Sequence, residues 1–377
     1  MSYGMTQKRC VIVGAGFAGA ATAYHLTQMG MNNVIVLEQE AVPGMHASGR
    51  NAAMVRQVIS GEPASAMARG GAAFLRHLPD SWPVETAFQQ TGSFLLADEK
   101  DAKQLQNDAL LATRSGIEAE WLPMDQIIAK VPVLEGSPTV GGVWCPNDGV
   151  IDIHALIHGY LGAAMALGAE VRFSEKITAI HTRGNRVAAV QTEAHEFETD
   201  ILVDAAGAWA GEVGTLAGAN PISLSPFRRH LFVTDALDWV SSDWPIVWDV
   251  SHEIYFRPES GGLLLSPCDE SLQKPGLPTQ DPAVLELLAH KTIQYFPKLA
   301  DLPIRNSWCG LRTFAPDRRF VIGWDPKLEG FFWVAGLGGH GVTVSYSVGV
   351  LAASMILQSR EHTLVNEFAP ARFRAKS

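Results

Sequence analysis

The sequence predicts an α/β protein of two domains, one of them discontinuous. A glycine-rich segment, residues 14–19, lies directly between a strand-like and a helix-like stretch. A second block of alternating strands and helices lies between residues 149 and 203. The intervening stretches, roughly 80–145 and 221–302, are richer in Pro and Trp and contain isolated strand-like runs. Alternating strands and helices predict a parallel sheet, and the intervening stretches predict an α+β domain on a mainly antiparallel sheet.

The first block has the order of a Rossmann-type nucleotide-binding fold. An apolar strand at 10–13 leads into the spacing G-x-G-x-x-G, and a helix is expected over 20–29. The glycines of this motif are Gly14, Gly16 and Gly19. They permit a tight turn, close approach of a pyrophosphate and close packing of helix on strand. Free N–H groups at the helix start would bind the phosphates.

The second strand of this block supplies the other part of the nucleotide signature. Gly30 stands where the helix should end, and the strand at 34–37 is followed by Glu38. A carboxylate about twenty residues after the glycine motif is placed to accept hydrogen bonds from ribose hydroxyls. This fingerprint predicts a dinucleotide site, but it serves NAD and FAD alike.

The remaining elements are expected in the order helix, strand, hairpin, strand, strand, helix. They fall at 153–167, 168–171, 177–182 with 186–192, 201–203, 331–335, and after Gly341, where Val344, Val348, Leu351 and Met355 recur at helical spacing. Further strands are expected at 93–96 and 230–233. The sequence therefore predicts a nucleotide-binding domain at 1–80, 146–220 and 303–377, and a substrate domain at 81–145 and 221–302.

Composition excludes several other classes of protein. The 377 residues carry a formal charge of −10, which argues against a nucleic-acid partner because phosphate binding needs a concentrated positive face. We expect neither a signal peptide nor a transmembrane segment, and the four widely spaced cysteines are typical of reduced thiols. A cytoplasmic protein is therefore expected. His154 and His158 lie four residues apart on one helix, but no third ligand accompanies them, so no metal site is predicted.

Five motifs, at residues 36–44, 48–53, 203–209, 308–312 and 338–343, resemble the D-amino-acid oxidase superfamily of FAD-dependent oxidoreductases. This group includes the glycine and sarcosine oxidases, and the most similar branch is that of the bacterial D-arginine dehydrogenases. The resemblance implies FAD as cofactor. The residues that the glycine motif and this resemblance assign to it are Gly14, Gly16, Phe17, Ala18, Gly19, Glu38, Gln39, Ser48, Gly49, Arg50, Asn51, Ala52, Ala53, Ile177, Ala206, Gly207, Trp209, Gly310, Gly338, Gly339, His340, Gly341, Val342 and Thr343.

The same resemblance places four residues at the substrate. Arg312 falls at the arginine that grips a substrate carboxylate, and a guanidinium fork suits that bidentate contact. Tyr255 and Arg229 match substrate-contacting positions, although a core tyrosine and a solvated or flavin-contacting arginine are open alternatives. His340 lies between two glycines at the expected flavin edge, and its side chain could also face away.

The chain departs from the D-arginine dehydrogenase branch at several positions. Met54, Arg56 and Ile59 replace that branch's polar residues, and Gly92 or Ser93 stands where its guanidinium-binding carboxylate lies. A guanidinium-bearing substrate is therefore not expected, because a buried cation needs a partner. Arg56 could instead recognise an acidic side chain or a second carboxylate.

The resemblance implies oxidation of a small amino acid or secondary amine by hydride transfer from Cα to flavin N5. The resulting imine would be hydrolysed to a keto acid. The alternatives are oxidation of a 2-hydroxy acid or glycerol phosphate, and a role as flavin subunit of a heteromeric amino-acid or opine dehydrogenase. Oxygen or a quinone-linked carrier would accept the electrons. Cys309 lies near a position that carries flavin covalently in some relatives, but its flanking residues favour non-covalent FAD.

Overall fold

The computed structural model describes residues 7–59, 62–358 and 364–373. A six-stranded sheet forms one half of the molecule, in the order β20-β21-β13-β1-β2-β9. Neighbouring strands in this sheet are parallel, except that β20 pairs with β21 in an antiparallel manner. Its strands are β1 (Cys10–Val13), β2 (Val34–Leu37), β9 (Glu170–Arg172), β13 (Ile201–Asp204), β20 (Val321–Trp324) and β21 (Phe331–Ala335).

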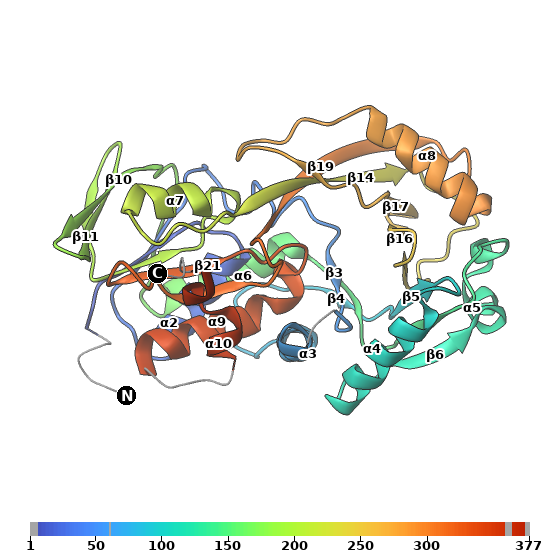
Figure 1. The fold of residues 1–377 in the computed structure, drawn as a ribbon, viewed down its shortest axis with the longest axis horizontal. Coiled ribbons are helices and arrows are strands. Elements are labelled where there is room, and N and C mark those ends of the chain that lie inside the picture. Colours follow the sequence, from blue (N-terminus) through green and yellow to red (C-terminus); the bar gives the residue numbers. More distant parts are fainter. Residues whose placement is uncertain (1–6, 60–61, 359–363, 374–377) are drawn as a thin grey trace.

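Helices bury this sheet, as a parallel sheet requires. Strands β1, β13 and β21 are buried at every position, and their sequences are near-continuous apolar runs. The helix that follows the glycine motif packs centrally between two other helices (Figure 1). These helices are α2 (Phe17–Gln28), α6 (Ile153–Ala166) and α9 (Gly341–Gln358), and α3 (Glu62–Arg76) packs on α9. The Asp152 side chain caps α6 by accepting from the N–H groups of His154 and Ala155.

A nine-stranded sheet forms the other half, in the order β18-β14-β17-β16-β15-β5-β7-β6 with β19 paired to β14. Its pairs are antiparallel except β5 with β15. The long strands β14 and β19 run back from this sheet toward the six-stranded half (Figure 1). The strands are β5 (Ser93–Ala97), β6 (Glu120–Pro123), β7 (Gly141–Cys145), β14 (Ser225–Thr234), β15 (Ile246–Asp249), β16 (Ile254–Glu259), β17 (Gly262–Ser266), β18 (Ser271–Leu272) and β19 (Ile304–Phe314).

Two small sheets and several helices complete the part of the chain that the structure describes. One sheet joins β10 (Ile177–Arg183), β11 (Arg186–Thr192) and β12 (Glu196–Glu198), beside α7 (Ala210–Ala217). The other joins β3 (Met54–Val55), β8 (Gly149–Ile151) and β4 (Phe88–Gln89). The nine-stranded half carries α4 (Ala102–Arg114), α5 (Met124–Lys130) and α8 (Ala283–Tyr295), and α10 (Val365–Phe368) lies near β20.

The predicted fold class is confirmed: an α/β half with the Rossmann order is joined to a mainly antiparallel sheet with flanking helices. The predicted strands at 93–96 and 230–233 lie within β5 and β14. The first helix begins at Phe17, three residues before the predicted start, because the extended backbone at Gly16 already ends the turn. The division of the chain into two domains stays a prediction. Among the described helices, none combines the length and apolar character that crossing a bilayer requires.

Candidate functional site

A cavity of about 510 Å³ lies where the two halves meet. Its wall includes the glycine-rich turn of the six-stranded half and residues of β14, β15, β16 and β19 of the nine-stranded sheet. It is lined by all four residues predicted to contact substrate and by every predicted cofactor residue except Gly19, Gly49 and Ala53. The lining residues predicted from the sequence are Gly14, Gly16, Phe17, Ala18, Glu38, Gln39, Ser48, Arg50, Asn51, Ala52, Ile177, Ala206, Gly207, Trp209, Arg229, Tyr255, Gly310, Arg312, Gly338, Gly339, His340, Gly341, Val342 and Thr343.

The glycine-rich turn leaves open space at one end of this cavity. Gly14 has φ +101°, and a Cβ there would lie 2.6 Å from the carbonyl oxygen of Ala205. A Cβ on Gly16 would lie 2.8 Å from Oγ of Ser48. Gly19 does not line the cavity: it lets α2 pack on the turn, because a Cβ there would overlap the carbonyl oxygen of Gly14. Gly14 and Gly16 therefore line the cavity, whereas Gly19 allows α2 to pack closely on the turn.

Glu38 lies at the end of β2 and fastens the same turn. One carboxylate oxygen accepts from Ala15 N–H at 2.8 Å, and the other accepts from Glu40 N–H at 3.1 Å. Burial raises the pKa of Glu38, and these hydrogen bonds oppose that rise. A carboxylate oxygen has more than one lone pair, so each can still accept from a ribose hydroxyl.

The loop at residues 48–53 closes over the turn. The Ser48 hydroxyl accepts from Phe17 N–H at 3.0 Å, and the Asn51 side chain donates to the Ser48 carbonyl at 2.7 Å. Arg50 donates from Nε to the Met45 carbonyl at 2.8 Å. Gly49 and Ala53 do not line the cavity but contribute to the backbone conformation of this loop. Ala53 has a left-handed backbone with φ 57°, and its N–H donates to Asn51 Oδ1.

The start of α9 forms the middle of the cavity. Gly338 has φ +56°, and a Cβ there would lie 2.5 Å from the ring of Phe314. A Cβ on Gly339 would lie 2.9 Å from Nη1 of Arg312, so the arginine lies against this turn. The first N–H groups of an α-helix have no partner within the helix, and the helix dipole adds partial positive charge there. Since Gly341 begins α9, these groups are available to an acceptor in the cavity.

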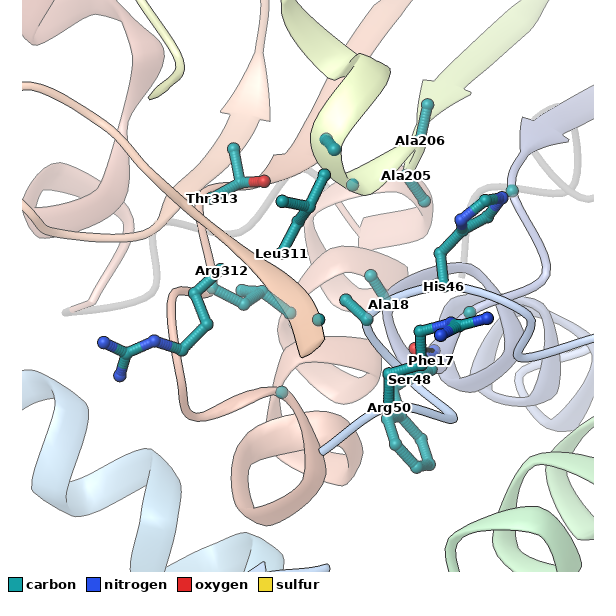
Figure 2. Close-up of a pocket in the computed structure, with 18 of the residues that line it drawn as sticks. Phe17, Ala18, His46, Ser48, Arg50, Ala205, Ala206, Leu311, Arg312 and Thr313 are labelled. Atoms are coloured by element: carbon teal, nitrogen blue, oxygen red, sulfur yellow. Dashed lines mark hydrogen bonds between the residues drawn. The ribbon is translucent and has the colours of Figure 1, made fainter. Parts of the chain in front are cut away.

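Arg312 extends away from the glycine-rich turn, on the β19 side of the cavity (Figure 2). Its Nη2 forms an ion pair with the carboxylate of Glu270, which also pairs with Arg318 at 2.9 Å. Its Nε is buried and has no hydrogen-bond partner among the described residues. Arg312 is therefore a cation at the cavity wall with one donor still unpaired.

Arg229 converges on the same carboxylate. Its Nη2 lies 3.4 Å from Glu270, its Nε donates to the Asp269 carbonyl at 3.0 Å, and its Nη1 is buried without a partner among the described residues. The side chain is 8% exposed, which excludes the solvated alternative for this arginine.

Tyr255 and His340 are the polar side chains expected beside these arginines. Tyr255 is buried, and its ring lies 4.8 Å from that of Trp248. Burial raises the pKa of Tyr255 to about 12, so its hydroxyl stays protonated at neutral pH. Burial, with a smaller effect of Arg56, lowers the pKa of His340 to about 4, so its imidazole is neutral. Neither is poised as a base with a pKa near neutrality.

Several lining residues were not predicted from the sequence. Trp248 and Leu231 lie on β15 and β14, and His46 lies near the glycine-rich turn with its ring 4.5 Å from Trp209. Strand alternation could have placed Trp248 on a sheet face, but nothing in the local pattern indicates that this face meets the cavity. Glu270 was missed because its arginine partners are distant in the chain.

Cys309 does not line the cavity, although its neighbour Gly310 does. The cysteine is fully buried, and its thiol donates to the Pro278 carbonyl at 3.5 Å. The strand geometry therefore turns this sulfur away from the side where the cofactor residues lie.

These features fit FAD. The cavity volume is in the range of small-molecule and cofactor sites. At one end, the turn at Gly14 and Gly16 leaves room for a backbone-bound pyrophosphate beside the buried acceptor Glu38. In the middle of the cavity, the glycines before α9 keep the wall open next to a helix N-terminus.

Comparison with known proteins agrees with this geometry. The family profile described as "DAO: FAD dependent oxidoreductase" matches residues 9–355. The chain is 26% identical over 379 residues to mitochondrial sarcosine dehydrogenase of Mus musculus, covering 96% of this chain but only 41% of that protein.

Solved structures of the same fold cover the chain almost completely. L-proline dehydrogenase from P. horikoshii superimposes with a TM-score of 0.88 at 21% identity, covering 97% of this chain and 98% of its own. Glycine oxidase from Geobacillus kaustophilus superimposes with a TM-score of 0.84 at 22% identity, covering 98% of this chain and 100% of its own. At these identities the structures establish the fold, and the profile, which spans most of the chain, establishes the family. The chain belongs to the DAO family of FAD-dependent oxidoreductases.

Proposed function

We propose that this protein oxidises the carbon–nitrogen bond of a small amino acid or secondary amine, such as a D-amino acid or an N-alkyl glycine. One observation carries the proposal. A single cavity is lined at one end by the nucleotide turn and Glu38, and at the other by Arg312, Arg229 and Tyr255. An anionic substrate group held by the arginines would therefore share one cavity with the cofactor.

FAD would be held non-covalently by the residues predicted for it. The N–H groups at the start of α2 would bind the pyrophosphate, Glu38 would accept from the ribose, and the start of α9 would hold the ring system. The buried thiol of Cys309, outside the cavity, supports a non-covalent cofactor. When bound, FAD supplies the two-electron acceptor to which the Cα hydrogen leaves as hydride.

The chain's own residues bind and orient the substrate. Arg312 would exchange Glu270 for the substrate carboxylate, and its unpaired Nε supplies the second donor of a bidentate contact. Arg229, whose Nη1 is unpaired among the described residues, would add positive charge beside the same substrate carboxylate. Trp248 and Leu231 form an apolar wall that excludes water. Holding the reacting carbon in position removes much of the entropic barrier.

The absence of a base near neutrality among the predicted pocket residues suits this chemistry. A neutral amine loses its Cα hydrogen with the electron pair, which leaves an iminium ion. Water then hydrolyses the imine to a keto acid and ammonia or a primary amine. Tyr255 and His340 act as neutral hydrogen-bonding groups, because burial keeps the first protonated and the second unprotonated.

The products distinguish this proposal from oxidation of a 2-hydroxy acid. Purified protein would be incubated with D-, L- and N-methyl amino acids and with their 2-hydroxy analogues, in the presence of oxygen or an artificial quinone. We expect a keto acid with ammonia, or a keto acid with a primary amine, from the nitrogen compounds only. Turnover of the hydroxy acids alone would overturn the proposal. Turnover that appears only when further chains co-purify would assign the protein to a heteromeric dehydrogenase.

A further inference from the structure

Arg56 adds a guanidinium to those of Arg50, Arg229 and Arg312 in the cavity lining. It follows β3, and its backbone N–H donates to Oγ1 of Thr343, in the first turn of α9, at 3.1 Å. Its guanidinium carbon lies 3.9 Å from the ring centroid of Trp248, on which it stacks. Trp248 in turn contacts Tyr255, so the cation lies in the part of the cavity that holds the predicted substrate residues.

This guanidinium has no anionic partner among the residues that the structure describes. Burial lowers the pKa of Arg56, and the charge of Asp148 offsets part of that effect. Asp148, however, lies beyond ion-pair distance, and its oxygens accept hydrogen bonds from Gln57 at 3.0 Å and from Ser93 at 2.7 Å. Arg312 and Arg229, by contrast, are both paired with Glu270.

The charge of the lining differs between its two ends. The acidic residues among the described lining are Glu38, Glu175 and Glu212. They follow β2 and β9 or lie on α7, all on the nucleotide side. Arg50 and Lys176 also lie on that side. The lining residues from β14, β15, β16 and β19 include Arg229 and Arg312 and no acid, and Arg56 stacks on Trp248 of β15. Removing an arginine from water without a counter-charge is unfavourable, so a site that retains one matches an anionic ligand group.

We propose that Arg56 binds a second carboxylate of the substrate, so that the preferred substrates are amino or imino acids with two carboxylates. One carboxylate lies at Arg312 and the other at Arg56. The planar guanidinium suits bidentate carboxylate binding, and stacking on Trp248 fixes its plane. This inference rests on the proposed function for the identity of the reacting group. A substrate with a guanidinium side chain would meet like charge, and one with a neutral side chain would leave Arg56 unpaired.

A binding experiment tests the subsite without turnover. The holoenzyme would be titrated with the non-reactive acids succinate and glutarate, and with their monoamides, by calorimetry. We expect each diacid to bind roughly tenfold or more tightly than its monoamide, because the amide leaves a charge without its hydrogen-bonded counter-ion. Arg56→Gln should abolish that preference, and Arg56→Lys should restore only part of it. Equal affinities of diacid and monoamide in the wild type would overturn the proposal.

A control variant separates this effect from general charge. Arg305→Gln removes an arginine that is 71% exposed and pairs with Asp235, so it should leave the diacid preference unchanged. A loss of preference in Arg305→Gln equal to that in Arg56→Gln would contradict the assignment to Arg56.

Kinetics then separate the two proposals. The ratio of kcat/KM for aspartate over asparagine, and for glutamate over glutamine, would be measured for both enantiomers. We expect the ratio to favour the diacid in the wild type and to collapse in Arg56→Gln. Oxidation of amino acids without a diacid preference would overturn the subsite but keep the proposed function. Diacid binding at Arg56 without oxidation of any amine would keep the subsite and overturn the function.

Discussion

At the scale of single residues, the site is organised around a carboxylate that the protein itself supplies. Glu270 pairs with Arg312, Arg229 and Arg318. A substrate carboxylate that binds Arg312 must displace or share this acid. The arrangement keeps the guanidinium oriented before substrate arrives, which lowers the cost of ordering this side chain on binding.

Arg312→Ala should retain FAD but lose substrate capture. Losing an oriented charge pair costs about 2–5 kcal/mol, which corresponds to roughly thirty- to several-thousand-fold in kcat/KM. Arg312→Lys should recover only part of the loss, because it keeps the charge without the fork. Steady-state kinetics on an amino acid and on an amine that lacks the carboxylate would check this. Equal losses for the two substrates would show that Arg312 does not act on the carboxylate.

Much of the residue-scale site could be predicted, and the omissions have a physical cause. Arg312 and His340 lie in two of the motifs, Arg229 and Tyr255 were assigned by matching positions, and all four line the cavity. Glu270 lies 42 residues before Arg312 and reaches it only through the packing of β19 on β14. Residue type and spacing carry no signal for such a contact.

At the scale of elements, the turn and helix α2 show how far local sequence goes. The strand, turn and second strand form where the sequence predicts them, and the helix forms with its start three residues earlier, because each is determined by neighbouring residues. The pairing of β5 with β15, parallel and about 150 residues apart, could not be predicted. An apolar run predicts a strand, but its partner depends on long-range packing.

Substitution of two glycines in this segment separates packing from backbone conformation. Gly19→Ala should destabilise the protein by roughly 3 kcal/mol, the upper end of overpacking costs, because the new Cβ meets the Gly14 carbonyl. Gly30 has φ +88° with open space around it, so Gly30→Ala should cost only about 1–2 kcal/mol. Urea unfolding and FAD content would be measured for both. The prediction is wrong if Gly30→Ala loses FAD or if Gly19→Ala keeps wild-type stability.

At the scale of the whole molecule, the cofactor cavity joins the two sheets. Its wall draws on β14, β15, β16 and β19 as well as on the turn before α2 and the start of α9. FAD in this position would contact both halves at once. Stability of the protein should therefore depend on FAD occupancy.

Removal of FAD should lower Tm, and adding it back should raise Tm with concentration. A free ligand at about 100 times its Kd adds about 2.7 kcal/mol to the free energy of unfolding. Thermal unfolding of stripped protein across an FAD titration would measure this, with NAD as the control nucleotide. A Tm that responds to NAD and FAD alike would contradict the cofactor assignment.

The C-terminal segment gives the molecule an acid-sensitive contact. Burial opposes ionisation of Asp317, but hydrogen bonds from Arg372 and Arg319 prevail and lower its pKa to about 2. A depressed carboxylate pKa stabilises the folded state above the unfolded pKa, near about 4, and this contribution is lost as pH falls toward the folded value. Asp317→Asn should therefore destabilise the protein at neutral pH and have a smaller effect at about pH 3. A difference in unfolding free energy that does not change between the two pH values would refute this.

Reduction of the flavin tests most directly the proposal that an amine is oxidised at FAD in this cavity. Holoenzyme would be mixed anaerobically with amino acids and N-methyl amino acids, each beside its 2-hydroxy analogue, while the flavin absorbance is followed. We expect bleaching by the nitrogen compounds, with saturation that Arg312→Ala abolishes. Flavin that stays oxidised with every amine while a hydroxy analogue bleaches it would contradict amine oxidation at this site.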